Sequence, residues 1–134
     1  MRMLLDASAL VNLVKRGEIS QLSQAQTLDL AIYEALNAVW KEHHKLKKIS
    51  METAAAFASL LQRAFNIIDK TSIEGIEEET FHIACKHGIT IHDASYVAAA
   101  LKRNLPLVTD DRRLAEKISG IVRTKSSREI QNII

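Results

Sequence analysis

A short apolar run near the N-terminus stops abruptly at a carboxylate, a pattern that few folds accommodate. The run Met3-Leu4-Leu5 shows no helical period and is typical of a strand buried on both faces, and Asp6 follows it directly. An unpaired carboxylate is costly inside such a strand, but at the carboxyl end of a central parallel strand it faces the crevice where open α/β sheets bind ligands. A simpler interpretation is that Asp6 only caps the helix that begins after it.

The same pattern recurs near the other end of the chain, where the stretch 107–109 (Leu-Val-Thr) leads into Asp110 and Asp111. Glu34 and Asp93 each stand in the first turn of an expected helix. In a parallel sheet with right-handed crossovers, the carboxyl ends of the strands and the first turns of the following helices share one edge. We therefore expect these acids to converge with the N-terminal aspartate, although they come from four segments of the chain.

Hydrophobic periodicity predicts short strands that alternate with amphipathic helices. The expected strands are 3–5, 27–30, 65–68, 107–109 and 121–122, and the expected helices cover 10–14, 31–47, 50–64, 73–87, a segment that opens at Asp93, one that ends at Gly120, and 126–134. Such alternation is typical of the α/β class, with a parallel sheet and helices on both faces. With 134 residues, one Pro and no linker, the chain is expected to form one domain over 1–134.

Cysteine content and hydropathy exclude several classes of protein. A single cysteine, Cys85, excludes a disulfide framework and a cysteine-based zinc site, and it fits a reducing compartment. No apolar run approaches the roughly 20 residues that a membrane span needs, and the N-terminal run is far too short for a signal peptide. We therefore expect a soluble, cytoplasmic protein with no membrane partner.

The expected cluster of acids indicates a metal site. Carboxylates within a few ångström of one another repel and raise each other's pKa, so they persist as charged groups only when cations bind them. A ligand set made only of oxygen favours hard ions, Mg²⁺ or Mn²⁺, with water at the remaining octahedral positions. The formal net charge is +2, and setting aside the five clustered acids leaves +7 on the remaining surface. A basic surface around an acidic pocket suits a phosphate-backbone ligand held over bound cations.

The acids and their neighbours resemble the PIN-domain ribonucleases, in particular the small VapC-type toxins of toxin–antitoxin pairs. The resemblance is carried by Leu-Leu-Asp-Ala-Ser at 4–8, by Glu34 opening a helix, by His-Asp-Ala-Ser-Tyr-Val-Ala-Ala-Ala at 92–100, and by Leu-Val-Thr-Asp-Asp-Arg-Arg-Leu at 107–114. These motifs span nearly the whole chain in the order that the family has them. The resemblance implies a single PIN-like domain with a five-stranded parallel sheet in the order 3-2-1-4-5.

The resemblance also implies which acids act. Asp6, Glu34 and Asp93 match the family's central metal-binding and catalytic acids. The family's Thr-x-Asp pattern makes Asp111 the fourth acid and leaves Asp110 at the variable position. Because the two aspartates are adjacent, the choice between them stays open, and Asp110 is kept as an alternative ligand. The number of ions, one or two, also stays open.

Several other residues are expected to support these acids. Ser8 and Thr109 match small hydroxyl positions that the family uses to hydrogen-bond the carboxylates. Arg112, directly after the acid pair, is expected to hold a phosphate of the RNA, as are Lys41 and Lys45 on the long second helix. For each of these three cations, a plain surface role fits the sequence at least as well.

The implied function is a metal-dependent endoribonuclease that leaves a 5′-phosphate and a 3′-hydroxyl. A metal-free alternative uses His92 as general base on the ribose 2′-hydroxyl, and it predicts a cyclic phosphate and no effect of EDTA. An alternative of another class is a non-catalytic binding module, either an inactive PIN relative or a receiver-like domain. Receiver domains normally carry a lysine on the last strand, which 107–109 and 121–122 lack, and an inactive relative is expected to have lost acids.

Partners follow from the resemblance. VapC-type toxins are usually homodimers, inhibited by a cognate antitoxin whose tail blocks the acidic pocket. We expect an RNA substrate, an antitoxin and a second copy of the chain, with the alanine-rich helix at 51–64 and the helix at 31–47 as candidate dimer surfaces. The same apolar faces also fit a role in the core. Neither the RNA that is cut nor the identity of the antitoxin follows from the sequence.

Overall fold

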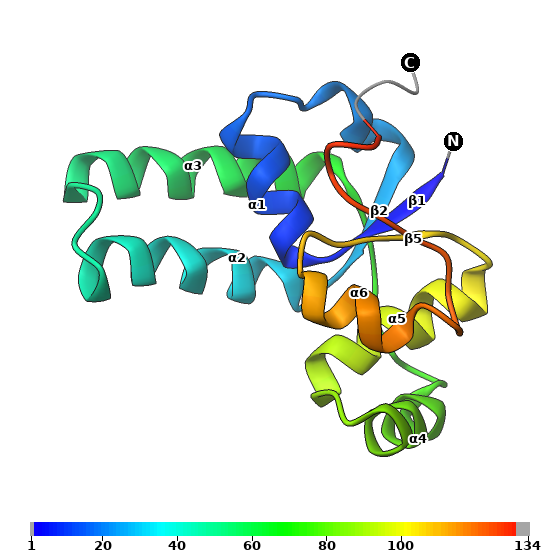
Figure 1. Cartoon of the computed structure of the whole chain (residues 1–134). Helices are drawn as coiled ribbons and strands as arrows, with labels where there is room; N and C mark the ends of the chain where they lie inside the picture. Colours follow the sequence, from blue (N-terminus) through cyan, green and yellow to red (C-terminus); the bar gives the residue numbers. More distant parts are fainter. Residues whose placement is uncertain (1, 131–134) are drawn as a thin grey trace.

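A parallel sheet of five strands lies at the centre of the protein, as seen in a computed structural model that describes residues 2–130 (Figure 1). The strand order is β3-β2-β1-β4-β5, which confirms the order implied by the family resemblance. The strands are β1 (Met3–Leu5), β2 (Ala25–Leu28), β3 (Asp69–Thr71), β4 (Leu107–Val108) and β5 (Thr124–Lys125). The helices are α1 (Ala7–Lys15), α2 (Ala31–Trp40), α3 (Met51–Ile67), α4 (Glu77–His87), α5 (Ile91–Arg103) and α6 (Arg112–Ile118), with a 3₁₀ turn at Ser20–Gln24 and a π-helical turn at Lys41–Lys45.

The strand β1 lies in the middle of the sheet, paired with β2 on one side and β4 on the other. Its three side chains are at most 1% exposed. Met3 and Leu5 belong to the apolar core covered by α1, α2 and α3, whereas Leu4 belongs to the core covered by α5 and α6. Burial on both faces explains why the sequence shows an unbroken apolar run, and it stabilises the fold by about 1.5–3 kcal/mol per side chain.

The helices α2 and α3 run side by side in opposite directions and reach out from the sheet (Figure 1). The helix predicted over 31–47 is α-helical only as far as Trp40, where it passes into the π-helical turn. The chain then reverses near Lys47, which has a φ of 51°. Ser50 caps α3 as predicted, because its Oγ accepts a hydrogen bond from the N–H of Thr53 at 3.1 Å.

Three predicted strands are displaced along the chain. They lie at 25–28, 69–71 and 124–125 instead of 27–30, 65–68 and 121–122. The last two are the edge strands of the sheet, and their sequences, Asp-Lys-Thr and Thr-Lys, carry no apolar pattern that could locate them. The apolar stretch 65–68 instead closes the last turn of α3, where Phe65 and Ile68 pack against the core.

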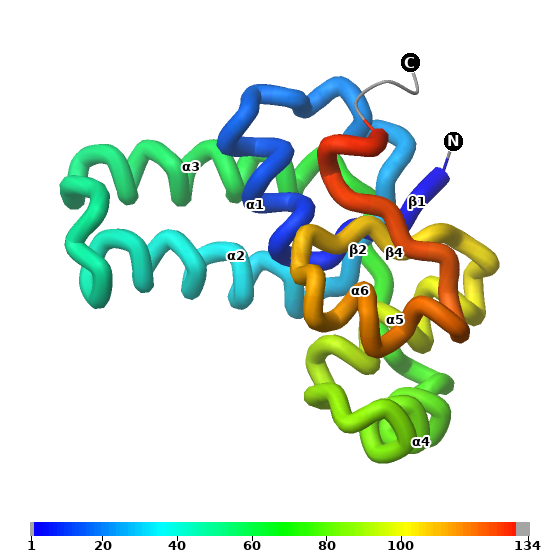
Figure 2. The backbone as a smooth tube through the Cα atoms, in the orientation of Figure 1, coloured from blue at the N-terminus to red at the C-terminus, as the bar shows by residue number. Residues whose placement is uncertain are grey.

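The helix predicted over 126–134 is wrong in its described part. Residues 127–130 form turns. The backbone N–H and the Oγ of Ser127 donate to the Asp110 side chain at 2.7 and 2.6 Å, which fixes this segment against the end of β4. Figure 2 shows this C-terminal segment passing beside β4 toward α1. The remainder of the prediction, 131–134, lies outside the described residues. None of the helices within residues 2–130 has the length and apolar character that a bilayer span requires.

Candidate active site

Asp6 stands between β1 and α1, at the carboxyl end of the central strand. Its Oδ1 accepts hydrogen bonds from the N–H of Ala9 at 2.9 Å and from the Oγ of Ser8 at 2.7 Å. The side chain therefore caps α1, as the simpler interpretation of the sequence expects, and it also lies at the carboxyl end of the central strand, as the other interpretation expects. Burial raises the pKa of Asp6 to about 6, against hydrogen bonds from Thr109, Ala9 and Ser8 that lower it. Burial therefore makes the ionised form of Asp6 less favourable than it is in water.

Asp93 lies in the first turn of α5, on the same edge of the sheet. Thr90 caps this helix, because its Oγ1 accepts a hydrogen bond from the N–H of Asp93 at 3.1 Å. Burial raises the pKa of Asp93, and the charge of Asp111 raises it further. The electrostatic effect shows that the first turn of α5 and the start of α6 bring two carboxylates into each other's field.

Glu34 lies in the first turn of α2, where a buried tyrosine holds it. The Oη of Tyr96, a side chain only 2% exposed, donates to Oε1 of Glu34 at 2.7 Å. Burial, the hydrogen bond to Glu34 and the negative charges of Glu34, Asp6 and Asp93 all raise the pKa of Tyr96. The phenol therefore stays protonated among acids from three different segments. Sequence analysis missed Tyr96 as a site residue, although it follows Asp93 by three residues on the same helix and so shares its face.

Asp110 and Asp111 are adjacent but have different surroundings. Asp111 is exposed and caps α6, with its Oδ1 accepting from the N–H of Leu114 at 3.1 Å. The Asp110 carboxylate accepts from Asn12 Nδ2 at 2.7 Å and from the N–H and Oγ of Ser127 at 2.7 and 2.6 Å. Burial raises the pKa of Asp110, but these hydrogen bonds outweigh it and leave that pKa below its ordinary value. Both oxygens of Asp110 are thus engaged by protein groups.

The hydroxyl groups singled out in the sequence contact the acids. Ser8 Oγ donates to Asp6 and also accepts from the N–H of Asp110 at 3.0 Å. Thr109 Oγ1 accepts from the N–H of Asp111 at 3.1 Å, and the Thr109 side chain lowers the pKa of Asp6 by hydrogen bonding. The two hydroxyls thereby connect the end of β1 with the end of β4.

The donor chemistry of these acids fits a hard divalent cation, whereas their spacing is wider than a bound ion requires. Within residues 2–130, no three His, Cys, Asp or Glu side chains lie close enough together to hold one metal ion. The ion pairs of this part of the chain, Arg2–Asp69, Lys15–Glu42 and Arg16–Glu18, involve none of the expected ligands. The acids thus form no salt bridge within residues 2–130, although the charges of His92 and Lys117 lower the pKa of Asp93 and that of Arg16 lowers the pKa of Asp110. A shared ion would require the acidic side chains to turn toward one another.

The three predicted phosphate-binding cations lie in two different places. Arg112 lines a cavity of about 680 Å³ between α1, α6 and residues 124–129, which we call the C-terminal cavity. Lys41 and Lys45 lie in the π-helical turn beyond the end of α2. At about 1.5 Å per helical residue, they are roughly 10–16 Å along the axis from Glu34. The structure therefore brings only Arg112 close to the acids.

Comparison with known proteins places this arrangement in a family. The profile of the PIN domain matches residues 3–119, which include every acid described above. The chain belongs to the PIN-domain family. Two relatives come from Pyrobaculum aerophilum. Ribonuclease VapC3 is 36% identical over 130 residues, covering 91% of this chain and 98% of the relative, and Exonuclease VapC9 is 33% identical over 121 residues, covering 89% and 87%.

Solved structures agree with the fold of this PIN domain. The crystal structure of PAE2754 from Pyrobaculum aerophilum is 31% identical, has a TM-score of 0.81, and covers 98% of this chain and 96% of its own. A toxin–antitoxin complex from Klebsiella pneumoniae contains a chain with a TM-score of 0.66 at 17% identity, covering 93% of this chain and 97% of that one. At such low identity the second similarity shows the fold alone.

Proposed function

We propose that this PIN domain is a metal-dependent endoribonuclease and the toxin of a toxin–antitoxin pair. The observation that supports this most is the buried carboxylate of Asp6, with a raised pKa, at the carboxyl end of the central strand. Asp93, Glu34 and Asp111 come to the same edge from three other segments, and the relatives are named as nucleases. Carboxylates arranged in this way suit phosphodiester hydrolysis over divalent cations.

We assign Asp6, Asp93 and Asp111 as ligands of one or two Mg²⁺ or Mn²⁺ ions, with Glu34 completing the catalytic set. A bound ion of this kind would lower the pKa of a water and offset charge on the leaving oxygen. Hydrogen bonds within the protein already orient two of these acids. Ser8 holds Asp6 by its Oδ1, and Tyr96 holds Glu34 by its Oε1. Asp110, whose oxygens are already hydrogen-bonded, is assigned a structural role instead of a ligand role.

The substrate in this proposal is the phosphodiester bond of single-stranded RNA. Water attacks phosphorus, the bond to the 3′-oxygen breaks, and the products are a 5′-phosphate and a 3′-hydroxyl. Asp6 has to be ionised for this role, and because burial raises its pKa to about 6, a proton competes with the cation for this carboxylate. At limiting Mn²⁺, cleavage is therefore expected to increase between pH 5 and 7.

The direct test is cleavage of a defined RNA by the wild-type protein and by Asp6→Asn. We expect cleavage with Mn²⁺ or Mg²⁺, none with EDTA, and a loss of at least about 100-fold in the variant. A circular RNA distinguishes endonuclease from exonuclease activity, a distinction that matters because one relative is named an exonuclease and the other only a ribonuclease. Full metal-dependent cleavage by a folded Asp6→Asn protein contradicts the proposed mechanism.

Analysis of the RNA ends separates the alternatives. A cyclic phosphate formed in EDTA supports His92 acting as a general base on the 2′-hydroxyl. Metal binding without cleavage of any RNA supports a non-catalytic module.

We further propose an antitoxin and a second copy of the chain as protein partners. The antitoxin is inferred from the relatives of more than 30% identity that are named VapC, together with the resemblance to VapC-type toxins. The outer helices α2 and α3 are the proposed dimer surface, because they carry exposed apolar side chains such as Tyr33, Trp40 and Leu60, which are 77%, 47% and 48% exposed. Light scattering of the purified chain, compared with Trp40→Ser, tests the dimer, and a monomeric wild-type protein contradicts it.

A further inference from the structure

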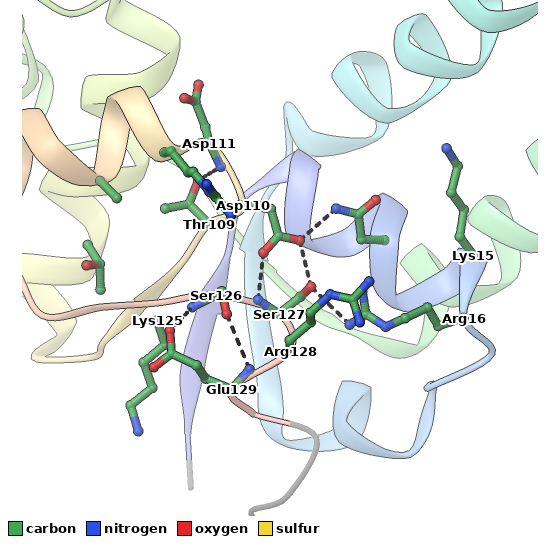
Figure 3. A pocket seen from close by; sticks show the side chains of 14 residues that line it. Lys15, Arg16, Thr109, Asp110, Asp111, Lys125, Ser126, Ser127, Arg128 and Glu129 are labelled. Atoms are coloured by element: carbon green, nitrogen blue, oxygen red, sulfur yellow. Dashed lines mark hydrogen bonds between the residues drawn. The ribbon is translucent and has the colours of Figure 1, made fainter.

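The C-terminal cavity lies beside the candidate active site and is formed by parts of the chain that are far apart in sequence (Figure 3). α1 contributes one wall, the start of α6 a second, and residues 124–129 a third. Asp111 belongs both to the candidate site and to the wall of this cavity. The C-terminal cavity therefore adjoins the candidate site.

Asp110 holds the cavity together. Its hydrogen bonds join α1, through Asn12, to the segment after β5, through Ser127. Arg16 Nη2 donates to the same Ser127 hydroxyl at 3.0 Å, which ties the end of α1 to this point (Figure 3). Asn12 is 98 residues from Asp110 in the chain, and Ser127 is 17 residues from it. The Asp110 carboxylate therefore holds the wall formed by residues 124–129 against α1.

The cavity is rich in positive charge. Five cationic side chains line it: Lys15, Arg16, Arg112, Lys125 and Arg128. The first two are ion-paired with glutamates, at 2.6 and 3.0 Å. The other three make no ion pair within residues 2–130. Of the acids in the wall, Asp110 is engaged as described, Asp111 caps α6, and Glu129 accepts from the N–H of Ser126 at 2.9 Å.

We propose that the C-terminal cavity is a subsite for the phosphate backbone of the RNA, in which Arg112, Lys125 and Arg128 bind phosphates adjacent to the one that is cut. This inference rests on the proposed ribonuclease activity. Five cations against three carboxylates line the cavity, and three of the cations make no ion pair within residues 2–130. This excess of positive charge favours an anionic ligand with repeated charges, and a polynucleotide strand supplies such charges at regular spacing. Contacts of this kind position the strand without reading its bases, so the subsite contributes affinity and register, not sequence preference.

The test is RNA binding by the full chain, measured by fluorescence anisotropy of a labelled single-stranded oligonucleotide in the Asp6→Asn background, where the RNA stays intact. The probe variant is Lys125→Ala/Arg128→Ala. Its control is Lys86→Ala/Lys102→Ala, which removes two positive charges from exposed positions on α4 and α5. At ~0.1 M salt we expect a roughly 10- to 30-fold loss of affinity in the probe variant and only a few-fold loss in the control.

Salt dependence gives a second, independent measure. Each phosphate contact on a single strand contributes roughly 0.7 to the slope of log affinity against log salt, so the probe variant is expected to lower that slope by about 1.4. Equal effects of the two double variants, in folded proteins with matching melting temperatures, overturn the subsite because net charge alone then explains them. Cavity-dependent binding by a wild-type protein that cuts no RNA with Mn²⁺ or Mg²⁺ leaves the subsite intact and overturns the proposed function.

Discussion

At the scale of single residues, Asp6 combines a structural and a chemical role. Its Oδ1 is used by the cap of α1 and by Ser8, and it is 5% exposed. Burial without a cation makes the ionised form costly. The folded protein therefore binds a proton at this carboxyl more tightly than the unfolded chain does, and this difference has a measurable effect on stability.

The pH dependence of stability follows from that difference. Because burial raises the pKa of Asp6 from 3.8 to about 6, its contribution is most favourable below about pH 4 and declines as the pH rises through 6. Well above pH 6, the contribution of Asp6 to the free energy of unfolding is lower by about 3 kcal/mol than it is below pH 4. Asp6→Asn keeps the oxygen that caps α1 and removes the charge. In EDTA at pH 7.5 we expect the variant to be more stable by about 1–3 kcal/mol, with the two proteins converging near pH 4, as followed by urea denaturation. A variant that is less stable at both pH values contradicts the assigned pKa.

Tyr96 is the other residue whose role depends on one contact. Tyr96→Phe keeps the buried ring and removes the hydrogen bond to Oε1 of Glu34. We expect a loss of about 1 kcal/mol in stability and about tenfold in cleavage, because Glu34 loses its fixed orientation. The matched control is Thr80→Val, which removes a buried hydroxyl that donates to the carbonyl of Ile76 at 2.8 Å. It should cost a similar amount of stability and leave cleavage unchanged. Equal cleavage by the two variants removes Tyr96 from the site.

At the scale of elements, the turn between β4 and α6 separates two adjacent aspartates into different tasks. Asp111 starts α6 and stays exposed, whereas Asp110 points to α1 and to the segment after β5. The difference arises because neighbouring residues at the end of an extended strand point in opposite directions. The elements packed around the turn therefore determine which of the two carboxylates is hydrogen-bonded to the rest of the protein.

Substitution of each aspartate by asparagine distinguishes the two tasks. Asp111→Asn retains a good helix cap, so we expect stability within about 0.5 kcal/mol of wild type and a loss of cleavage of at least about 100-fold. Asp110→Asn weakens three hydrogen bonds to a charged group, so we expect a loss of about 1–3 kcal/mol in stability with a smaller effect on cleavage. Urea denaturation and RNA cleavage of both variants check this, and the reverse pattern makes Asp110 the ligand.

At the scale of the whole molecule, the sheet order brings the acids to one edge. Placing β1 between β2 and β4 sets the carboxyl ends of two acid-bearing strands next to each other, and the crossovers bring the first turns of α2 and α5 to the same edge. The result is a concentration of negative charge without ion pairs of its own, which a divalent cation can stabilise.

Binding of that cation should therefore stabilise the entire fold. With Mn²⁺ at about 100 times its dissociation constant, we expect the free energy of unfolding to rise by about 2.7 kcal/mol. The increase should be absent in Asp6→Asn and retained in Asp69→Asn, an exposed aspartate at the opposite end of a strand, in β3. Thermal melts with and without Mn²⁺ measure both. An equal shift in all three proteins indicates weak binding to surface carboxylates instead of a site.

Much of this protein is encoded locally along the chain. The unbroken apolar run before Asp6 predicts the central strand, the alternation of elements predicts a parallel sheet, and the acids with their neighbours indicate the PIN family and so its strand order. These signals are strong because they arise from burial of contiguous residues and from helix caps, which need few long-range contacts.

Other properties depend on contacts that no local pattern reveals. The edge strands β3 and β5 are short and polar, so only pairing with their neighbours defines them. Glu34 and Tyr96 meet across 62 residues, and Asp110 meets Asn12 across 98. Of the two adjacent aspartates, Asp111 caps α6, whereas Asp110 joins α1 to the C-terminal segment. The reason is that α1 and this segment present hydrogen-bond donors to Asp110 alone. A side chain's identity sets what it can bind, and the packed structure sets which partner it meets.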